Sequence, residues 1–183
     1  MLKGNALDAA ILRLPSQPLR STYFRAMPLR FATDPLGVKR PIFAQRFNVA
    51  GGARILYLAE DQLTCLHEAQ LFGSPIVPVA LVPIALDLHA IVDLRTREVQ
   101  KILRTTRTEL LFDFRSLATK FQPAPTQVLG EAVAASARID GLLYESPALA
   151  GDADLAIIEK TLLSLGYSVV VTDSSSGLSA RLP

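Results

Sequence analysis

The chain has 183 residues, of which 50% are hydrophobic and 20% are charged, and its formal net charge is +2. This composition indicates an ordered globule, and a length near the roughly 150 residues of a typical domain can bury a core without metal or disulfide staples. The small net charge excludes a dedicated nucleic-acid surface, so we expect no direct nucleic-acid binding, although phosphate-containing small molecules stay open.

The residue patterns predict one domain over 1–183 in which helices and strands do not alternate regularly. In chain order they predict a helix at 2–14, a strand at 21–29, a strand-like segment at 43–48, a strand at 55–59 and a helix at 61–72. Next come two buried or edge strands within 75–88, helices at 96–103, 109–118 and 126–137, a strand at 139–145, a helix at 155–165 and a strand at 169–172. This order favours an α+β fold with a mixed sheet over a doubly wound fold.

Neither a secretory signal nor a membrane span is visible in the sequence. The apolar segment 75–88 is shorter than the ~20 residues that cross a bilayer, and prolines 75, 78 and 83 interrupt it. We therefore expect no membrane association, and the cytoplasm is the expected compartment.

The most informative feature is an arginine, a tyrosine and a glutamate within one compact unit. Arg46 stands at a strand-like end, and a turn at Gly51 and Gly52 permits close backbone approach. The next strand carries Tyr57, and the helix after it presents Glu68 at the border of its apolar face. These three side chains could hold a dinucleotide and strain its glycosidic bond.

Several standard chemistries lack their residue patterns here. The sequence has no P-loop, no G-x-G-x-x-G, no H-E-x-x-H and no G-x-S-x-G. His67 and His89 are the only histidines, and we interpret them as packing or surface residues rather than metal or triad groups. The single cysteine, Cys65, excludes disulfide frameworks and four-ligand zinc clusters and is expected in the core. We therefore expect no metal.

Five segments together resemble the RES domain, a family of bacterial toxins named after arginine, glutamate and serine. Arg46-Phe47-Asn48 and the glycines after it resemble the R-[FW]-N-x-x-G motif, and Leu56-Tyr57-Leu58-Ala59 resembles the L-Y-x-A strand. The other three are the strand Tyr23-Phe24-Arg25, the helix from Thr64 to Glu68, and the later strand 141–147 that contains Ser146. The resemblance covers a core region of about 20–172.

The resemblance implies an ADP-ribosyltransferase-like fold with a mixed or split sheet, and a toxin that consumes NAD and causes growth arrest. It also implies a partner, an Xre-type antitoxin that occludes the active site. NAD is the substrate, so no cofactor is expected, and a homo-oligomer stays open. Hydrolysis, phosphorolysis and transfer of ADP-ribose to a protein are open alternatives, as are a catalytically inactive module that binds nucleotide or partner and a secreted effector.

The chemistry of NAD cleavage gives each predicted catalytic residue a role. Breaking the N-glycosidic bond passes through an oxocarbenium-like state that needs a nearby carboxylate, which Glu68 can supply. The planar fork of Arg46 suits pyrophosphate or ribose oxygens. Tyr57 offers a ring face to the nicotinamide or ribose, and its hydroxyl could reach substrate. Each residue also has an alternative without function: Glu68 as a solvated carboxylate, Arg46 as part of a surface ion pair, and Tyr57 as an aromatic residue that packs in its strand.

Further candidates for substrate binding are Ser146, Arg25 and Asn48. Ser146 could hydrogen-bond the nicotinamide amide or the ribose, or it could only form the turn before Pro147. Arg25 is expected to add positive potential near the phosphates. The remaining cations near the unit are interpreted as solvated charges: Lys39, Arg40 and Arg54.

Overall fold

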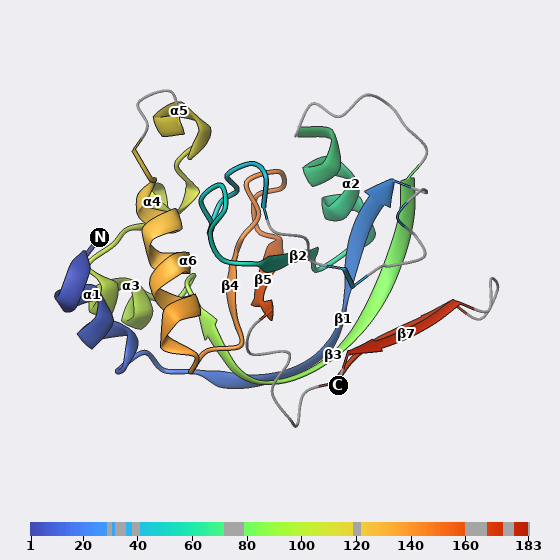
Figure 1. Ribbon diagram of the computed structural model, residues 1–183, viewed down its shortest axis with the longest axis horizontal. Helices are drawn as coiled ribbons and strands as arrows, with labels where there is room; N and C mark the ends of the chain where they lie inside the picture. The colour runs from blue at the N-terminus through green and yellow to red at the C-terminus, as the bar shows by residue number, and fades with distance from the viewer. Residues whose placement is uncertain are drawn as a thin grey trace.

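The computed structural model describes residues 1–28, 31, 36–37, 41–71, 79–118, 122–159, 168–173 and 178–182. The strands in this part of the chain are β1 (Gln17–Pro28), β2 (Ile55–Ala59), β3 (Val79–Asp93), β4 (Gly141–Glu145), β5 (Ala153–Ile158), β6 (Ser168–Asp173) and β7 (Leu178–Leu182). They form one sheet in the order β1-β2-β5-β4-β3-β6-β7 (Figure 1).

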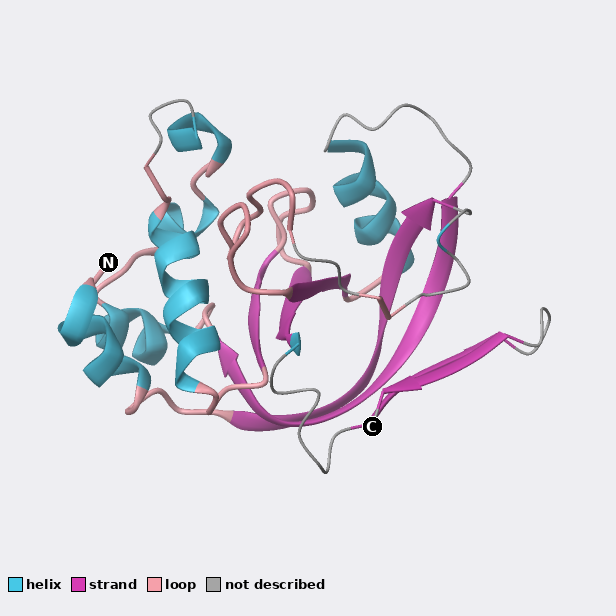
Figure 2. Cartoon of the chain, in the orientation of Figure 1, coloured by secondary structure: helices cyan, strands magenta, loops and turns pink. Residues whose placement is uncertain are grey.

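The long strands β1 and β3 pair antiparallel along most of their length and make a curved arch (Figure 2). β1 also meets β2 at the pair Phe24–Ala59, so that β1, β2, β5, β4 and β3 close into a ring of paired strands. β3 and β4 run parallel, whereas the other pairs are antiparallel. The sheet is therefore mixed, as predicted. Strand β3 has different partners along its length: its middle pairs with β6, and its C-terminal end pairs with β4.

The helices of the described chain are α1 (Gly4–Ile11), α2 (Gln62–Leu71), α3 (Arg97–Leu103), α4 (Arg107–Leu111), α5 (Arg115–Ala118) and α6 (Pro125–Ser136). Polar side chains start several of them: Asp61 accepts backbone N–H groups at the start of α2, and Thr96 and Thr106 do so for α3 and α4. α1, α3, α4 and α6 gather on one side of the sheet, while α2 packs against β1 and β2 (Figure 1). None of these described helices has the length and apolar character of a membrane span.

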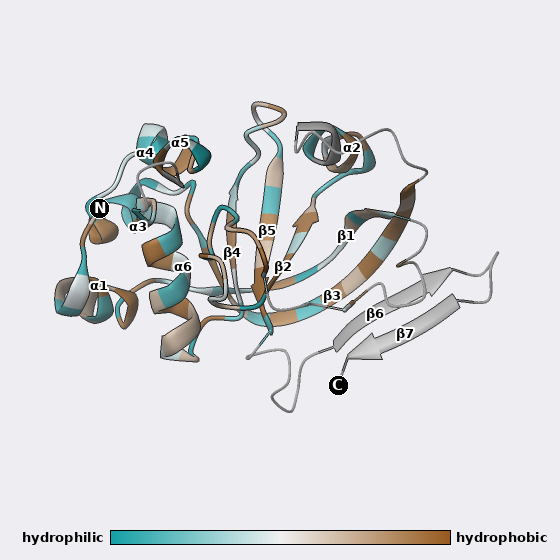
Figure 3. Ribbon diagram, turned by 45° about the horizontal axis from the view of Figure 1, so that its top comes forward, coloured by the Kyte–Doolittle hydropathy of each residue, from teal (hydrophilic) through white to brown (hydrophobic). Residues whose placement is uncertain are grey.

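The core consists of two clusters of buried apolar side chains, because the strands alternate in the faces they present (Figure 3). One cluster lies within the curve of the sheet and includes Leu56, Ile84, Leu88 and Leu155. The other lies between the sheet and α1, α3, α4 and α6 and includes Phe47, Leu103, Leu129 and Leu142. Phe47 is fully buried, so it anchors its two neighbours in the candidate site, Arg46 and Asn48.

Most predicted elements are confirmed with small shifts in their bounds. The confirmed strands are 21–29, 55–59, 139–145 and 169–172, and the confirmed helices are 2–14, 61–72, 96–103 and 126–137, except that residues 29 and 72 lie outside the described residues. β2 has the predicted bounds, whereas β1 begins earlier, at Gln17. The α+β class with a mixed sheet is also confirmed.

Two predicted helices are wrong in part. Residues 155–158 belong to strand β5, which is buried along its whole length between β2 and β4, whereas Glu159 is helical. An apolar run that is buried on both faces lacks the alternation that distinguishes a strand from a helix. The predicted helix 109–118 is divided into α4 and α5, because Phe112 has an extended ψ of 139° that stops α4. Residues 160–165 lie outside the described residues.

Three differences concern strands. The segment 43–48 forms a turn closed by an isolated bridge between Gln45 and Asn48, not a strand. Within 75–88 the structure has one strand, β3, rather than two, and 75–78 lie outside the described residues. Strand β7 was not predicted, although its five residues alternate between apolar and polar side chains, because so short a run is a weak signal.

Candidate active site

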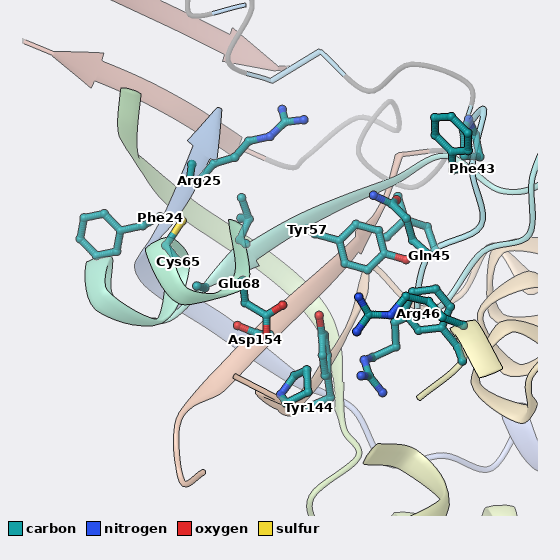
Figure 4. A pocket seen from close by; sticks show the side chains of 18 of the residues that line it. Phe24, Arg25, Phe43, Gln45, Arg46, Tyr57, Cys65, Glu68, Tyr144 and Asp154 are labelled. Atoms are coloured by element: carbon teal, nitrogen blue, oxygen red, sulfur yellow. The ribbon is translucent and has the colours of Figure 1, made fainter. Parts of the chain in front are cut away.

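A cavity of about 730 Å³ lies beside β1, β2 and α2 (Figure 4). The loop before β2 and the segment from α4 to α5 complete its wall. Arg25, Arg46, Tyr57 and Glu68 all line it, although they belong to four different segments. Small-molecule sites typically have volumes of about 300–1,000 Å³. The fold therefore brings four of the predicted site residues to one cavity of suitable size.

Arg46 is fixed by backbone carbonyls and aromatic rings. Its side chain is only 8% exposed, and Nη1 donates a hydrogen bond of 2.8 Å to the carbonyl of Leu110 and a weaker one of 3.4 Å to Phe112. These carbonyls lie at the end of α4, where no helical partner remains for them. The guanidinium carbon lies 5.8 Å from the ring centre of Phe114 and 6.0 Å from that of Tyr144. Arg46 therefore presents a rigidly held positive charge to the cavity.

The hydroxyl of Tyr57 is used within the protein. It donates a hydrogen bond of 2.7 Å to Oδ1 of Asn48 and accepts one of 3.0 Å from the backbone N–H of Phe47. Burial raises the pKa of Tyr57 above its ordinary value, so the hydroxyl keeps its proton. The hydroxyl thus ties β2 to the residues around Arg46. The ring of Tyr57 lines the cavity, and contact between its hydroxyl and a substrate stays a prediction.

Asn48 and Ser146 lie behind the wall of the cavity. Asn48 is 1% exposed and holds the Tyr57 hydroxyl. Ser146 is 2% exposed, and its Oγ donates a hydrogen bond of 2.8 Å to Oε1 of Glu68. Each of them thus positions a residue that lines the cavity, and direct contact with a substrate stays a prediction for both.

A carboxylate from α6 organises the loop that follows Arg46. Glu131 accepts the backbone N–H of Val49 at 3.1 Å and that of Ala53 at 2.9 Å. The chain approaches so closely that a Cβ on Gly52 would lie 2.1 Å from the Glu131 carboxylate. The predicted role of the glycine turn in close backbone approach is therefore confirmed.

Helix α6 also packs directly against the backbone next to Arg46. Gln127 donates a hydrogen bond of 2.9 Å from Nε2 to the carbonyl of Gln45. A Cβ on Gly130 would lie 1.9 Å from the carbonyl oxygen of Phe47. No side chain fits between the helix and this turn, so α6 is a platform that sets the position of Arg46.

Glu68 faces a second carboxyl group that the sequence analysis missed. Asp154, in the otherwise apolar strand β5, is 2% exposed and lines the cavity beside Glu68 (Figure 4). Burial, and then the negative charge of Glu68, raise the pKa of Asp154 to about 8. A lone aspartate inside an apolar run was the signal available in the sequence.

Tyr144 lies between Arg46 and the two carboxyl groups, and it too was missed. Its ring packs edge-on against Phe47, with ring centres 4.9 Å apart, and it lines the cavity. Burial, and after it the charges of Asp154 and other neighbours, raise its pKa well above the ordinary value. Tyr144 therefore contributes a neutral aromatic surface between the cationic and the acidic sides of the cavity.

The other cations differ in their access to the cavity. Arg25 lines it and donates to the carbonyl of Gly37 at 3.3 Å. Arg115, which was not predicted, also lines it and pairs with Asp113 at 2.9 Å. Arg54 instead pairs with Glu159 at 2.7 Å and is not part of the wall. Lys39 and Arg40 lie outside the described residues.

The cavity mouth is apolar on one side. Ile42 and Phe43 are 81% and 79% exposed, and both line the cavity together with Phe31. Exposed apolar side chains at the rim of a cavity are suited to contact with a flat ring system or with a partner protein. None of these three residues was predicted from the sequence.

The described residues include no cluster of three or more histidine, cysteine or acidic side chains arranged to hold a metal ion. His89 is exposed on β3 and His67 is half-buried on α2, and neither lines the cavity. Cys65 is buried, as predicted, and burial raises the pKa of its thiol to about 12. The cavity wall itself presents arginines, carboxyl groups and aromatic rings.

The structure is similar to a chain of the crystal structure of the M. tuberculosis MbcT–MbcA toxin–antitoxin complex. The TM-score is 0.74 and the sequence identity 17%, and the match covers 98% of this chain and 93% of that chain. At this identity the similarity concerns the fold. No curated protein matches the chain. The family model of the RES domain, however, matches residues 20–173. The resemblance predicted from the sequence is thereby confirmed, and the chain belongs to the RES domain family.

Proposed function

We propose that this chain is a RES-type toxin that consumes NAD by cleaving the bond between nicotinamide and ribose and so arrests growth. We also propose that residues 1–183 form a single domain with an ADP-ribosyltransferase-like fold. Family membership and the similarity to a chain of a toxin–antitoxin complex support this proposal. The observation that carries it is the convergence of Arg46, Tyr57 and Glu68 on one cavity of about 730 Å³.

In this proposal each side of the cavity has a distinct task. On the acidic side, Glu68 would stabilise the positive charge that develops on the ribose as nicotinamide leaves. On the cationic side, the fixed guanidinium of Arg46 would bind pyrophosphate or ribose oxygens, with Arg25 adding positive potential. The ring of Tyr57 would stack on the nicotinamide or the ribose between them. NAD is the substrate in this scheme, and no resident cofactor takes part.

A chain that destroys NAD in the cytoplasm needs an inhibitor in the same cell. We therefore propose an Xre-type antitoxin as partner, which covers the cavity and competes with NAD for it. The exposed apolar pair Ile42 and Phe43 at the mouth would bury against such a partner, and acidic or polar groups of the partner would meet Arg46.

Chromatography of the products formed from NAD tests the activity. Purified protein is incubated with NAD in a phosphate-free buffer, with inorganic phosphate, or with a cell extract. Free nicotinamide together with ADP-ribose indicates hydrolysis, and a phosphorylated ADP-ribose formed only with phosphate indicates phosphorolysis. Nicotinamide release accompanied by labelled proteins in the extract indicates transfer. Absence of nicotinamide release under all three conditions would contradict the proposed activity and favour a module that only binds nucleotide or partner.

A further inference from the structure

Asp154 is buried in the wall of the cavity. It is 2% exposed, and in the described chain neither Oδ1 nor Oδ2 has a hydrogen-bond partner. Leaving an ionised carboxylate in this state is costly, because burial removes the water that would solvate it. Its strand neighbours do not help, since β5 pairs it with Ala59 of β2 and Tyr144 of β4 through the backbone only.

The group that Asp154 faces is another carboxyl, Glu68 (Figure 4). Ser146 lies next to both, but its hydroxyl has a single proton, and it donates that proton to Oε1 of Glu68 at 2.8 Å. Ser146 Oγ meanwhile accepts the backbone N–H of Ala148 at 3.2 Å. Glu68 therefore receives the one hydroxyl proton of Ser146, which is not available to Asp154 although Ser146 also lies within hydrogen-bonding reach of it.

Two carboxyl groups in contact cannot both be ionised at low energetic cost, so such a pair holds one proton between them. The charged and titratable groups around Asp154 are Glu68 and Cys65 on α2, Tyr144 on β4, Tyr23 on β1, and Arg46. Arg46 alone among them favours ionisation of Asp154. The difference in donors places the proton on Asp154 and the negative charge on Glu68.

We propose that Asp154 is a positioning residue that holds this proton at neutral pH and donates it in a hydrogen bond to Glu68. This contact and the one from Ser146 then hold the Glu68 carboxylate in its charged form at the wall of the cavity. The inference rests on the proposed function for the role of Glu68, but the protonation of Asp154 stands on the geometry of the pair. Loss of the proton places two negative charges side by side, and Glu68 is then pushed from its position.

The pH profile of nicotinamide release from NAD tests the catalytic consequence. In wild type the rate should fall at alkaline pH, as Asp154 ionises around pH 8. Asp154→Asn keeps a neutral donor toward Glu68, so it should retain a substantial rate without the alkaline fall. Asp154→Leu keeps the branched shape of the side chain, although it is larger, and has no donor, so it should lose about tenfold or more in a folded protein. As a matched control, Asp140→Asn changes a buried aspartate that serves two backbone N–H groups of β3, and it should keep the alkaline fall.

Two results would overturn the inference: an alkaline fall that persists in Asp154→Asn, or a folded Asp154→Asn protein as inactive as Asp154→Leu.

Failure of wild type to release nicotinamide would instead contradict the proposed function. The protonation of Asp154 would then be tested by a measurement of stability, which does not depend on activity. The pKa of Asp154 is raised in the folded protein above its value of about 3.9 in the unfolded chain. Folding therefore takes up a proton at any pH between these two pKa values. The thermal midpoint of wild type should therefore fall, relative to Asp154→Asn, as the pH rises from about 4 to 8. Parallel midpoint curves would exclude a proton on Asp154.

Discussion

Replacing Tyr57 with phenylalanine is expected to weaken the attachment of the loop that carries Arg46. The hydroxyl makes two hydrogen bonds, of 2.7 Å to Asn48 Oδ1 and of 3.0 Å from Phe47 N–H, and both partners are 0–1% exposed. Without the hydroxyl, both partners remain buried and unpaired, which costs about 1–3 kcal/mol each. The variant no longer buries a polar hydroxyl, which offsets part of this cost. The net loss in the free energy of unfolding is then about 2–4 kcal/mol. For a chain of this length that corresponds to a fall of roughly 4–16 °C in the thermal midpoint.

The assay is thermal and urea denaturation of Tyr57→Phe beside Tyr144→Phe as a matched control. Tyr144 is also buried beside Arg46, but its hydroxyl makes no hydrogen bond with any described residue. Its removal should therefore change the free energy of unfolding by less than about 1 kcal/mol. Equal losses in the two variants, or none in Tyr57→Phe, would refute the argument that the Tyr57 hydroxyl supports the loop.

Three further substitutions test how the site is held together. Gly130→Ala would bring a Cβ to 1.9 Å from the carbonyl oxygen of Phe47, so thermal denaturation should show a loss of about 3 kcal/mol or more, and wild-type stability would contradict the packing described. Glu131→Ala removes the acceptor of two backbone N–H groups in the loop. Urea denaturation should show a loss of about 2–4 kcal/mol in the free energy of unfolding, and a change below about 1 kcal/mol would refute this role of Glu131. Arg46→Lys keeps the charge but loses the planar fork, so initial rates should fall nearly as far as in Arg46→Ala; a Lys variant with most of the activity would reduce Arg46 to a general electrostatic contributor.

The elements that the sequence predicted well are those with local signals. α3 begins after Thr96, whose side chain accepts a backbone N–H, and α6 has Pro125 in its first turn. The strand β5 gave no such signal, because its burial on both faces comes from neighbours distant in sequence. Its apolar run therefore fitted a helix equally well, and only the pairing with β2 and β4 decides between them.

The same distinction separates the site residues that were predicted from those that were missed. Arg46, Tyr57 and Glu68 stand close together in the sequence, so one motif was enough to predict that they share a cavity. Asp154 and Tyr144 pair across two strands, and their place beside Glu68 depends on the register of β4 and β5. This register could not be read from the sequence, because β4 was predicted but its partner β5 was not.

The most direct test of the proposed function is the rate of nicotinamide release from NAD by wild type and by Glu68→Gln. The substitution keeps the size of the side chain and removes the charge that would stabilise the transition state. Wild type should release nicotinamide, and a folded Glu68→Gln protein should be slower by about 10²-fold or more. Glu98→Gln, at an exposed position of α3 away from the cavity, serves as the matched control and should keep the wild-type rate. A folded Glu68→Gln protein with a near-normal rate would contradict the assignment of Glu68, and an inactive wild type would contradict NAD cleavage itself.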